Sequence, residues 1–112
     1  MQLSTEDLPN GVTRAILIGR LDIDGAQAID LRLNALAGSR KALVIDMSEV
    51  SYLASMGLRT LMTCARANAS RGGKLAVANP QPSVVKVLET SGMYEIIAVH
   101  PSLDDAVVAV SS

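Results

Sequence analysis

The 112-residue sequence predicts an α/β fold, with a mostly parallel sheet and an antiparallel hairpin at its N-terminal edge. Short aliphatic runs have the length of strands buried on both faces, and stretches with helical spacing of apolar residues separate them. Strands that alternate with helices imply parallel pairing through right-handed crossovers. The predicted order is β-β-α-β-α-β-α-β-α, with about four helices. No linker or low-complexity tract divides the chain, so residues 1–112 are expected to form a single domain.

The N-terminal hairpin is predicted from Asn10-Gly11, a dipeptide typical of two-residue turns. It joins an edge strand near Gln2–Leu8 to a second strand, Val12–Ile18, which contains the apolar run AILI. Gly19 is expected to end this second strand.

The remaining elements follow in alternation. Gly38 is expected to stop the first helix, and the strand 42–45 precedes a second helix that Gly72-Gly73 closes. The strand 74–77 leads to a third helix, from Pro82 to Ser91-Gly92. The strand 96–99 leads to a fourth, which opens with an S-x-x-D capping box at Ser102. The apolar stripes of the four helices are Ala26, Ile29, Leu33 and Leu36; Leu58, Leu61, Met62 and Ala65; Val84, Val87 and Leu88; and Leu103, Ala106, Val107 and Val110.

Composition argues against several classes of function. The chain has no Phe or Trp and only two Tyr, so it lacks the stacking platforms of single-stranded nucleic-acid binders. Its net charge of −1 comes without a basic cluster, and we expect no nucleic-acid partner. No apolar run approaches the roughly 18 residues of a membrane span, and the start MQLSTEDLPNG is unlike a secretory signal. With the single cysteine, Cys64, these features predict a cytoplasmic protein without direct membrane insertion.

The stretch SYLASMGLRT places Ser55 just before a predicted helix, where a serine has three possible roles. A hydrolase nucleophile is the weakest, because the elbow G-x-S-x-G lacks its first glycine, replaced by Leu53. The only histidine, His100, is expected on a surface loop, and Cys64 is expected to pack in the helix. One Cys and one His offer no metal-ligand spacing, and no phosphate-cradling glycine motif occurs.

The other two roles of Ser55 are compatible with each other. As an N-cap, its hydroxyl would accept from free N–H groups of the first helical turn. As a phosphorylation site, it would place a phosphate where those N–H groups and the helix dipole favour an anion. The added charge, roughly −1.5 to −2, would then weaken the binding of a partner that docks over the helix start. Met56 is a candidate docking residue, with packing against the loop as the alternative.

The sequence resembles the STAS domain, and within it the anti-sigma factor antagonists of bacterial partner-switching systems. The resemblance covers nearly the whole chain and depends on the order and spacing of short motifs rather than on any one of them. The matching residues are Gly19, Leu21 and Asp22 (G-x-L-D); Asp46, Ser48 and Val50 (D-x-S-x-V); Ser55, Gly57 and Leu58 (S-x-G-L, the phosphoacceptor motif); Gly72-Gly73; Pro82; and Leu88 with Ser91-Gly92 and Ile96.

The resemblance implies a regulator rather than an enzyme. A cognate serine kinase of the anti-sigma type, with a GHKL fold and its own ATP, would phosphorylate Ser55 and thereby release the domain. A PP2C-type phosphatase would reset the serine, and the domain would need no cofactor. The regulated output stays open: a sigma factor, secretion, motility or biofilm formation. The alternatives are a STAS subunit with a constitutive structural role, for instance in a membrane transport complex, and an enzyme that uses Ser55.

Family members commonly carry aspartate before the acceptor serine and a small hydroxyl residue after it, whereas this chain has Ala54 and Met56. Loss of the aspartate removes a like charge beside the phosphate, so phosphorylation is still expected, while kinase contacts, rate or partner choice can change. Ser51 is a distant second acceptor. Asp46 is expected at the end of its strand, where it orders the following loop.

The candidate partner-binding residues surround Ser55. The two acids after the second strand are expected to face basic residues of the kinase, with helix capping as the alternative, which is favoured for Asp24. Arg59, one turn into the helix, is a candidate rim contact. The full set is Asp22, Asp24, Ala54, Met56, Gly57 and Arg59.

Overall fold

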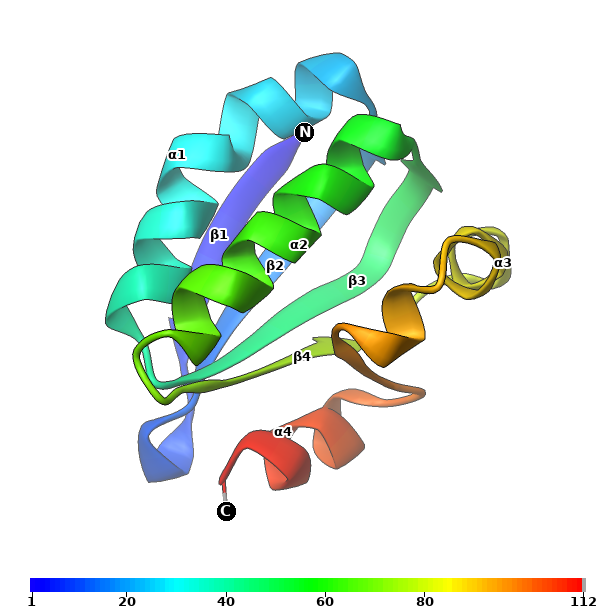
Figure 1. The fold of residues 1–112 in the computed structure, drawn as a ribbon. Coiled ribbons are helices and arrows are strands. Elements are labelled where there is room, and N and C mark those ends of the chain that lie inside the picture. The colour runs from blue at the N-terminus through cyan, green and yellow to red at the C-terminus, as the bar shows by residue number, and fades with distance from the viewer. Residues whose placement is uncertain (112) are drawn as a thin grey trace.

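The structure is a computed structural model that describes residues 1–111, and this part of the chain forms a sheet with helices packed on both faces (Figure 1). The strands are β1 (Gln2–Asp7), β2 (Thr13–Leu21), β3 (Ala42–Leu53), β4 (Lys74–Ala78) and β5 (Ala98–His100). The α-helices are α1 (Ile23–Ser39), α2 (Ser55–Ala69), α3 (Pro82–Thr90) and α4 (Leu103–Ser111). Two 3-10 turns, η1 (Pro9–Gly11) and η2 (Met93–Glu95), complete the described elements.

The five strands lie in the sheet in their order along the chain, β1-β2-β3-β4-β5. The pair β1–β2 is antiparallel, and the pairs β2–β3, β3–β4 and β4–β5 are parallel. Each parallel pair is connected through a helix, as the alternating pattern requires. The predicted fold class is therefore confirmed, including the antiparallel hairpin at the N-terminal edge.

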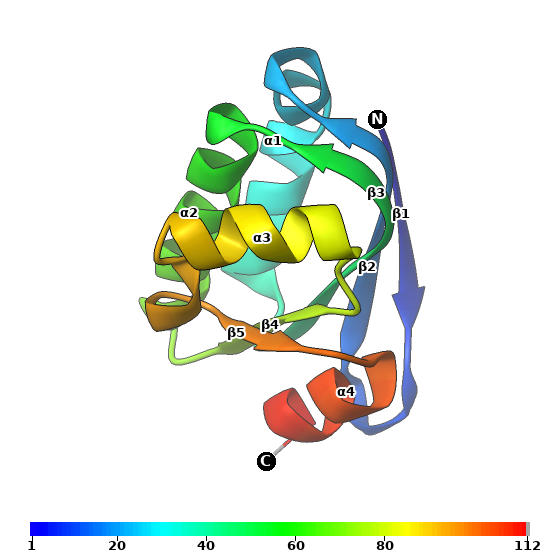
Figure 2. The ribbon, with the colours of Figure 1, turned by 90° about the vertical axis from the view of Figure 1, so that its right-hand side faces the viewer.

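Aliphatic side chains fill two cores, one on each face of the sheet. The larger core lies beneath α1, α2 and α3 and includes the fully buried residues Leu17, Leu33, Ile45, Leu61 and Leu88. The smaller core lies beneath α4, which is set apart from the other three helices (Figure 2). Without Phe or Trp, the burial of Val, Ile, Leu, Ala and Met supplies the hydrophobic stabilisation.

The hairpin differs from the predicted two-residue turn. Its loop contains three residues, Pro9 to Gly11, and Leu8 donates its backbone N–H to the carbonyl oxygen of Val12 over 2.8 Å. In a two-residue turn at Asn10-Gly11, position 9 would have to donate that bond, and proline has no N–H. The φ angles of Asn10 and Gly11, 70° and 75°, still explain why these two residue types stand at the turn.

Several element ends also differ from the predictions. Gly19 does not end β2 but lies within it, with a φ of 120° beside an irregularity in the β2–β3 pairing. Gly38 lies inside α1, because the helix continues until Arg40 donates its N–H to Leu36. Strand β5 begins only at Ala98.

Other predicted ends are confirmed. Pro82 opens α3, and Gly92 follows that helix with a left-handed φ of 76°. Gly72 adopts a φ of 73° after α2, and the Ser102 hydroxyl accepts from the N–H of Asp105 over 3.1 Å. Among residues 1–111, none of the helices combines the length and apolar character needed to cross a membrane.

Candidate functional site

The starts of α1 and α2 lie side by side, because β2 and β3 remain paired to their last residues (Figure 1). Leu21 pairs with Leu53, and the next residues along the chain are Asp22 and Ala54. The backbone N–H of Ala54 donates to the carbonyl oxygen of Leu21 over 3.0 Å. This is the carboxyl edge of the parallel strands, where open α/β sheets place their functional sites. The structure thus brings two predicted segments of the site together.

Ser55 is the first residue of α2, and its side chain is exposed. The N-cap position belongs to Ala54, whose extended backbone (φ −107°, ψ 175°) precedes the helix and whose carbonyl oxygen accepts from Leu58 over 3.1 Å. The prediction that Ser55 caps the helix was therefore wrong by one residue. Alanine carries no acceptor, so no side chain caps α2 at this position. The helix start is left with N–H groups that an anion can bind.

Gly57 packs against the end of β2 at a distance that no side chain permits. A Cβ at this position would lie 2.7 Å from the carbonyl oxygen and Cγ of Leu21 and 2.7 Å from Cδ1 of Leu53. Gly25 has the same role at the start of α1, where a Cβ would clash with the carbonyl oxygen of Arg20. The glycine of S-x-G-L is thus required for packing, and contact of Gly57 with a partner stays a prediction.

Asp22 is the N-cap of α1 and accepts from the N–H of Gly25 over 2.8 Å. The pKa of its carboxyl is lowered, first by this backbone bond and also by the Arg20 guanidinium, whose Nε lies 3.4 Å from Oδ2. The capping alternative therefore applies to Asp22 rather than to Asp24, which is exposed in the first turn of α1. Contact of either acid with a partner stays a prediction.

A stacked pair that the sequence did not predict lies beside the site. The Arg20 guanidinium lies 4.3 Å from the ring centroid of Tyr52, its partner in the β2–β3 pairing. Both residues are exposed. Their positions in the sequence give no sign of this contact, because it depends on the register that the two strands adopt.

A hollow of about 340 Å³ lies between α1 and α2 and contains two of the predicted residues, Met56 and Arg59. Met56 is half-buried and packs against the larger core, whereas Arg59 is exposed. The packing alternative for Met56 is confirmed, and its side chain also lines an open surface, while its role in docking stays a prediction. The other lining residues are Ala26, Gln27, Asp30, Thr60 and Thr63.

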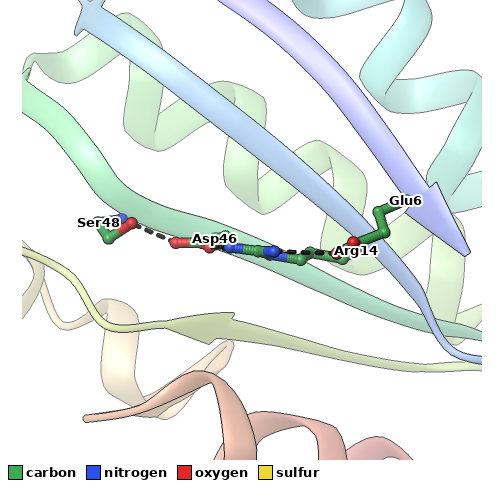
Figure 3. Close-up of polar contacts among 4 residues, drawn as sticks. All are labelled: Glu6, Arg14, Asp46 and Ser48. Atoms are coloured by element: carbon green, nitrogen blue, oxygen red, sulfur yellow. Dashed lines mark hydrogen bonds and ion pairs between the residues drawn. The ribbon is translucent and has the colours of Figure 1, made fainter. Parts of the chain in front are cut away.

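Asp46 differs from its expected position at a strand end. It lies within β3, is 3% exposed, and accepts from the N–H of Ser48 over 2.9 Å. Its other oxygen accepts from the Arg14 guanidinium, with Nε at 3.0 Å, and Arg14 also pairs with Glu6 over 2.9 Å (Figure 3). Burial alone would raise the pKa of Asp46, but the bonds from Ser48 and Arg14 outweigh it and lower that pKa. The group joins β1, β2 and β3.

The side chains considered for catalysis are not gathered around Ser55. His100, which was expected on a surface loop, is instead the half-buried last residue of β5 and lines a separate hollow of about 280 Å³ with Tyr94 and Pro101. Cys64 is fully buried in the larger core, and burial, with Asp30 nearby, raises the pKa of its thiol to about 12. Its predicted role in packing is confirmed. In the part of the chain that the structure describes, no three His, Cys, Asp or Glu residues are grouped as metal ligands.

Comparison with known proteins agrees with this fold and motif order. The family model of the STAS domain matches residues 10–106. The Bordetella bronchiseptica protein BtrV, which carries the name of an anti-sigma factor antagonist, is 30% identical over 107 residues, covering 94% of this chain and 91% of BtrV. The chain belongs to the STAS family, and within that family to the anti-sigma factor antagonists.

Solved structures place the same fold in two kinds of protein. An anti-sigma factor antagonist from Mycobacterium paratuberculosis matches with a TM-score of 0.88 and 30% identity, over 99% of this chain and 94% of that one. A murine anion transporter of the solute carrier 26 family matches with a TM-score of 0.74 and 23% identity, over 88% of this chain and 17% of the transporter. The second likeness concerns the fold alone.

Proposed function

We propose that this protein is a partner-switching regulator whose state is set by phosphorylation of Ser55. The observation that carries the proposal is the exposed hydroxyl of Ser55 at the first position of α2, within the motif S-x-G-L of an anti-sigma factor antagonist. The adjacent N-cap has no side-chain acceptor, so a phosphate on Ser55 meets N–H groups at the positive end of the helix dipole.

The partners follow from the kind of protein to which the chain is related. The unphosphorylated form binds a serine kinase of GHKL type that acts as an anti-sigma factor, and this kinase supplies the ATP. The Ser55 oxygen forms a bond to the γ-phosphorus of ATP while the bond from that phosphorus to the bridging oxygen breaks, so that ADP leaves and the hydroxyl proton passes to solvent. The resulting phosphoserine releases the kinase. A PP2C-type phosphatase hydrolyses the phosphoester and resets the switch. The regulator is cytoplasmic and acts as substrate and ligand, without a cofactor or catalytic residue of its own.

The partner surface comprises the two helix starts and the hollow between them. Asp24 and Arg59 offer exposed charges of opposite sign, and Met56 offers an apolar side chain at the rim. Asp22, Ala54 and Gly57 fix the backbone on which these side chains stand. A phosphate adds roughly −1.5 to −2 charges to the middle of this surface, which disfavours an apolar or acidic contact already formed there.

Phosphate incorporation tests the proposal directly. The purified chain is incubated with a GHKL-type kinase from the same genome and ATP, and the intact mass is measured for wild type, Ser55→Ala and Ser51→Ala. Ser51 is the matched control, because it is an exposed serine four residues before Ser55. We expect one phosphate on the wild type and on Ser51→Ala and none on Ser55→Ala.

Binding completes the test. Calorimetry is expected to show that the phosphorylated protein binds the kinase about tenfold or more weakly than the unphosphorylated protein does. This difference corresponds to at least about 1.4 kcal/mol. Ser55→Ala should bind as the unphosphorylated wild type does. Normal phosphate uptake by Ser55→Ala, or equal affinity of both forms, would show that Ser55 is not the switch.

A constitutive role in a membrane transport complex is the second candidate. Two observations favour it: Ala54 stands where the family commonly has aspartate, and the fold also occurs in an anion transporter. A subunit of that kind needs no acceptor serine. Affinity purification that recovers transporter components, with wild type and Ser55→Ala in equal yield, would support this candidate over the switch.

A further inference from the structure

We propose that Arg59 is the intramolecular partner of a phosphate on Ser55, so that phosphorylation also withdraws this arginine from the surface that a partner contacts. The inference rests on the proposed function for the presence of the phosphate. The observation on which the inference is based is the spacing of the two residues on α2. Ser55 and Arg59 are four residues apart on the helix, and both are exposed.

Residues four apart on a helix are neighbours, with roughly 5–6 Å between their Cβ atoms. An acidic group that precedes a basic group at this spacing is the more favourable order, because it agrees with the helix dipole. A phosphoserine at position 55 would be the acidic group in that order. Its oxygens accept the parallel N–H bonds that a guanidinium donates, and such charge-assisted bonds are stronger than neutral ones.

Arg59 is available for this contact. The ion pairs within residues 1–111 join Arg14 to two carboxylates and Arg20 to Asp22, and none of them includes Arg59. Asp30 lies across the hollow from Arg59, on α1. Its Oδ1 already accepts from Asn34 over 3.1 Å and from Thr60 over 3.4 Å. No ion pair joins Asp30 to Arg59, so the guanidinium of Arg59 is left for a more highly charged anion.

The charged groups of the neighbouring elements do not replace Arg59. At the start of α1 these are the carboxylates Asp22 and Asp24, which repel a phosphate. On the β2 side Arg20 is held by Asp22 and by stacking on Tyr52. The first turn of α2 contains no acidic residue that would compete with the phosphate for Arg59.

The contact would change the partner surface in two ways at once. The phosphate adds negative charge at the helix start, and the guanidinium moves from the rim of the hollow toward that charge. A partner that uses an acidic side chain against Arg59 would lose this contact in addition to meeting the phosphate. Arg59 would thus be a positioning residue for the switched state.

Phosphoserine installed at position 55 during translation, in the full chain, allows a test that needs no kinase. The second pKa of the phosphate is measured by ³¹P NMR titration at low salt in wild type, Arg59→Gln, Arg59→Lys and Arg66→Gln. Arg66 is the matched control, an exposed arginine on α2 about 16 Å further along the helix than Ser55. Circular dichroism of each variant checks that the helices are intact.

We expect the pKa of the phosphate to be higher in Arg59→Gln than in wild type by about 0.3 of a pH unit, with Arg59→Lys between them. Arg66→Gln should match wild type. Equal values in wild type and Arg59→Gln, or an equal shift in Arg66→Gln, would overturn the inference. Because the phosphate is installed without a kinase, failure of the kinase to modify Ser55 would overturn the proposed function and leave this result standing.

Discussion

The carbonyl oxygen of Leu21 accepts a 3.0 Å hydrogen bond from the backbone N–H of Ala54, which fixes the start of α2 to the end of β2. The same oxygen lies 2.7 Å from the position that a Cβ on Gly57 would occupy. The last residue of β2 therefore sets where the first turn of α2 lies. Because Ser55 is in that turn, its place at the surface depends on a strand more than 30 residues earlier in the chain.

Gly57→Ala tests this packing. The added methyl group would have to displace the backbone oxygen of Leu21 and the side chain of Leu53, so we expect the free energy of unfolding to fall by about 2 kcal/mol. Gly38→Ala is the control, since Gly38 also lies in a helix and a Cβ there meets nothing within 4 Å. That variant should be more stable than wild type by up to about 1 kcal/mol. Urea unfolding measures both, and an equal effect of the two substitutions would contradict the packing argument.

Ala54→Asp restores an acceptor at the N-cap of α2. The extended backbone at position 54 suits a capping residue, so the free energy of unfolding should rise by about 1 kcal/mol. Ala54→Asn separates capping from charge, because it supplies an acceptor without a carboxylate. With phosphoserine at position 55, the gain from Ala54→Asp should shrink, since the carboxylate and the phosphate compete for the same N–H groups. A gain of the same size in both states, by urea unfolding, would refute that competition.

Asp46→Asn is expected to make the free energy of unfolding less dependent on pH in the acidic range. The pKa of Asp46 is lowered in the folded protein, so its carboxylate contributes stability above its unfolded pKa, about 3.9, and loses this contribution as pH falls through the folded pKa. At pH 7 the variant should be less stable by about 2 kcal/mol, because the charged bonds from Arg14 and Ser48 are weakened.

The difference between Asp46→Asn and wild type should therefore be largest at neutral pH and shrink below about pH 4. Urea unfolding over a pH series gives both curves. Glu6→Gln is a control for the exposed end of the same group, and a cost below about 1 kcal/mol is expected. A difference for Asp46→Asn that does not change with pH would argue against an ionised Asp46 in the folded state.

Cys64 is expected to be inert in the folded protein. Its thiol has a pKa of about 12 and is fully buried, so at pH 8 almost none of it is thiolate. Reaction with an aromatic disulfide reagent should be slower than in the unfolded chain by on the order of 1,000-fold. Absorbance at pH 8, with and without denaturant, measures the ratio. Fast reaction of the native protein would mean that α2 opens far more readily than its packing suggests.

The sequence predicted the centres of the elements better than their ends. The run ALVI located β3, but the strand continues for eight residues beyond it to Leu53. That continuation, DMSEVSYL from Asp46 on, is mixed in polarity and contains a shift in register, so neither an apolar run nor a strict alternation marks it. Its strand character comes from pairing with β2, and a single-sequence pattern carries no information on a pairing partner.

The candidate site was predicted in its position but not in its local geometry. The motif S-x-G-L located Ser55 at the start of a helix, and the order of the strands brought Asp22 beside it. The one-residue offset that makes Ala54 the cap depends on backbone angles rather than on residue type. The stack of Arg20 on Tyr52 depends on the register of the β2–β3 pairing, which the composition of the strands does not reveal.

The strand order β1-β2-β3-β4-β5 has a consequence for how the chain assembles. Each strand pairs with the one synthesised just before it, so the contacts that build the sheet join segments close in sequence. A nascent chain leaving the ribosome can therefore extend the sheet at one growing edge as each strand emerges. No completed pair of strands has to separate to admit a later one, and the start of α2 can dock on the β2–β3 pair before the C-terminal third of the protein has been made.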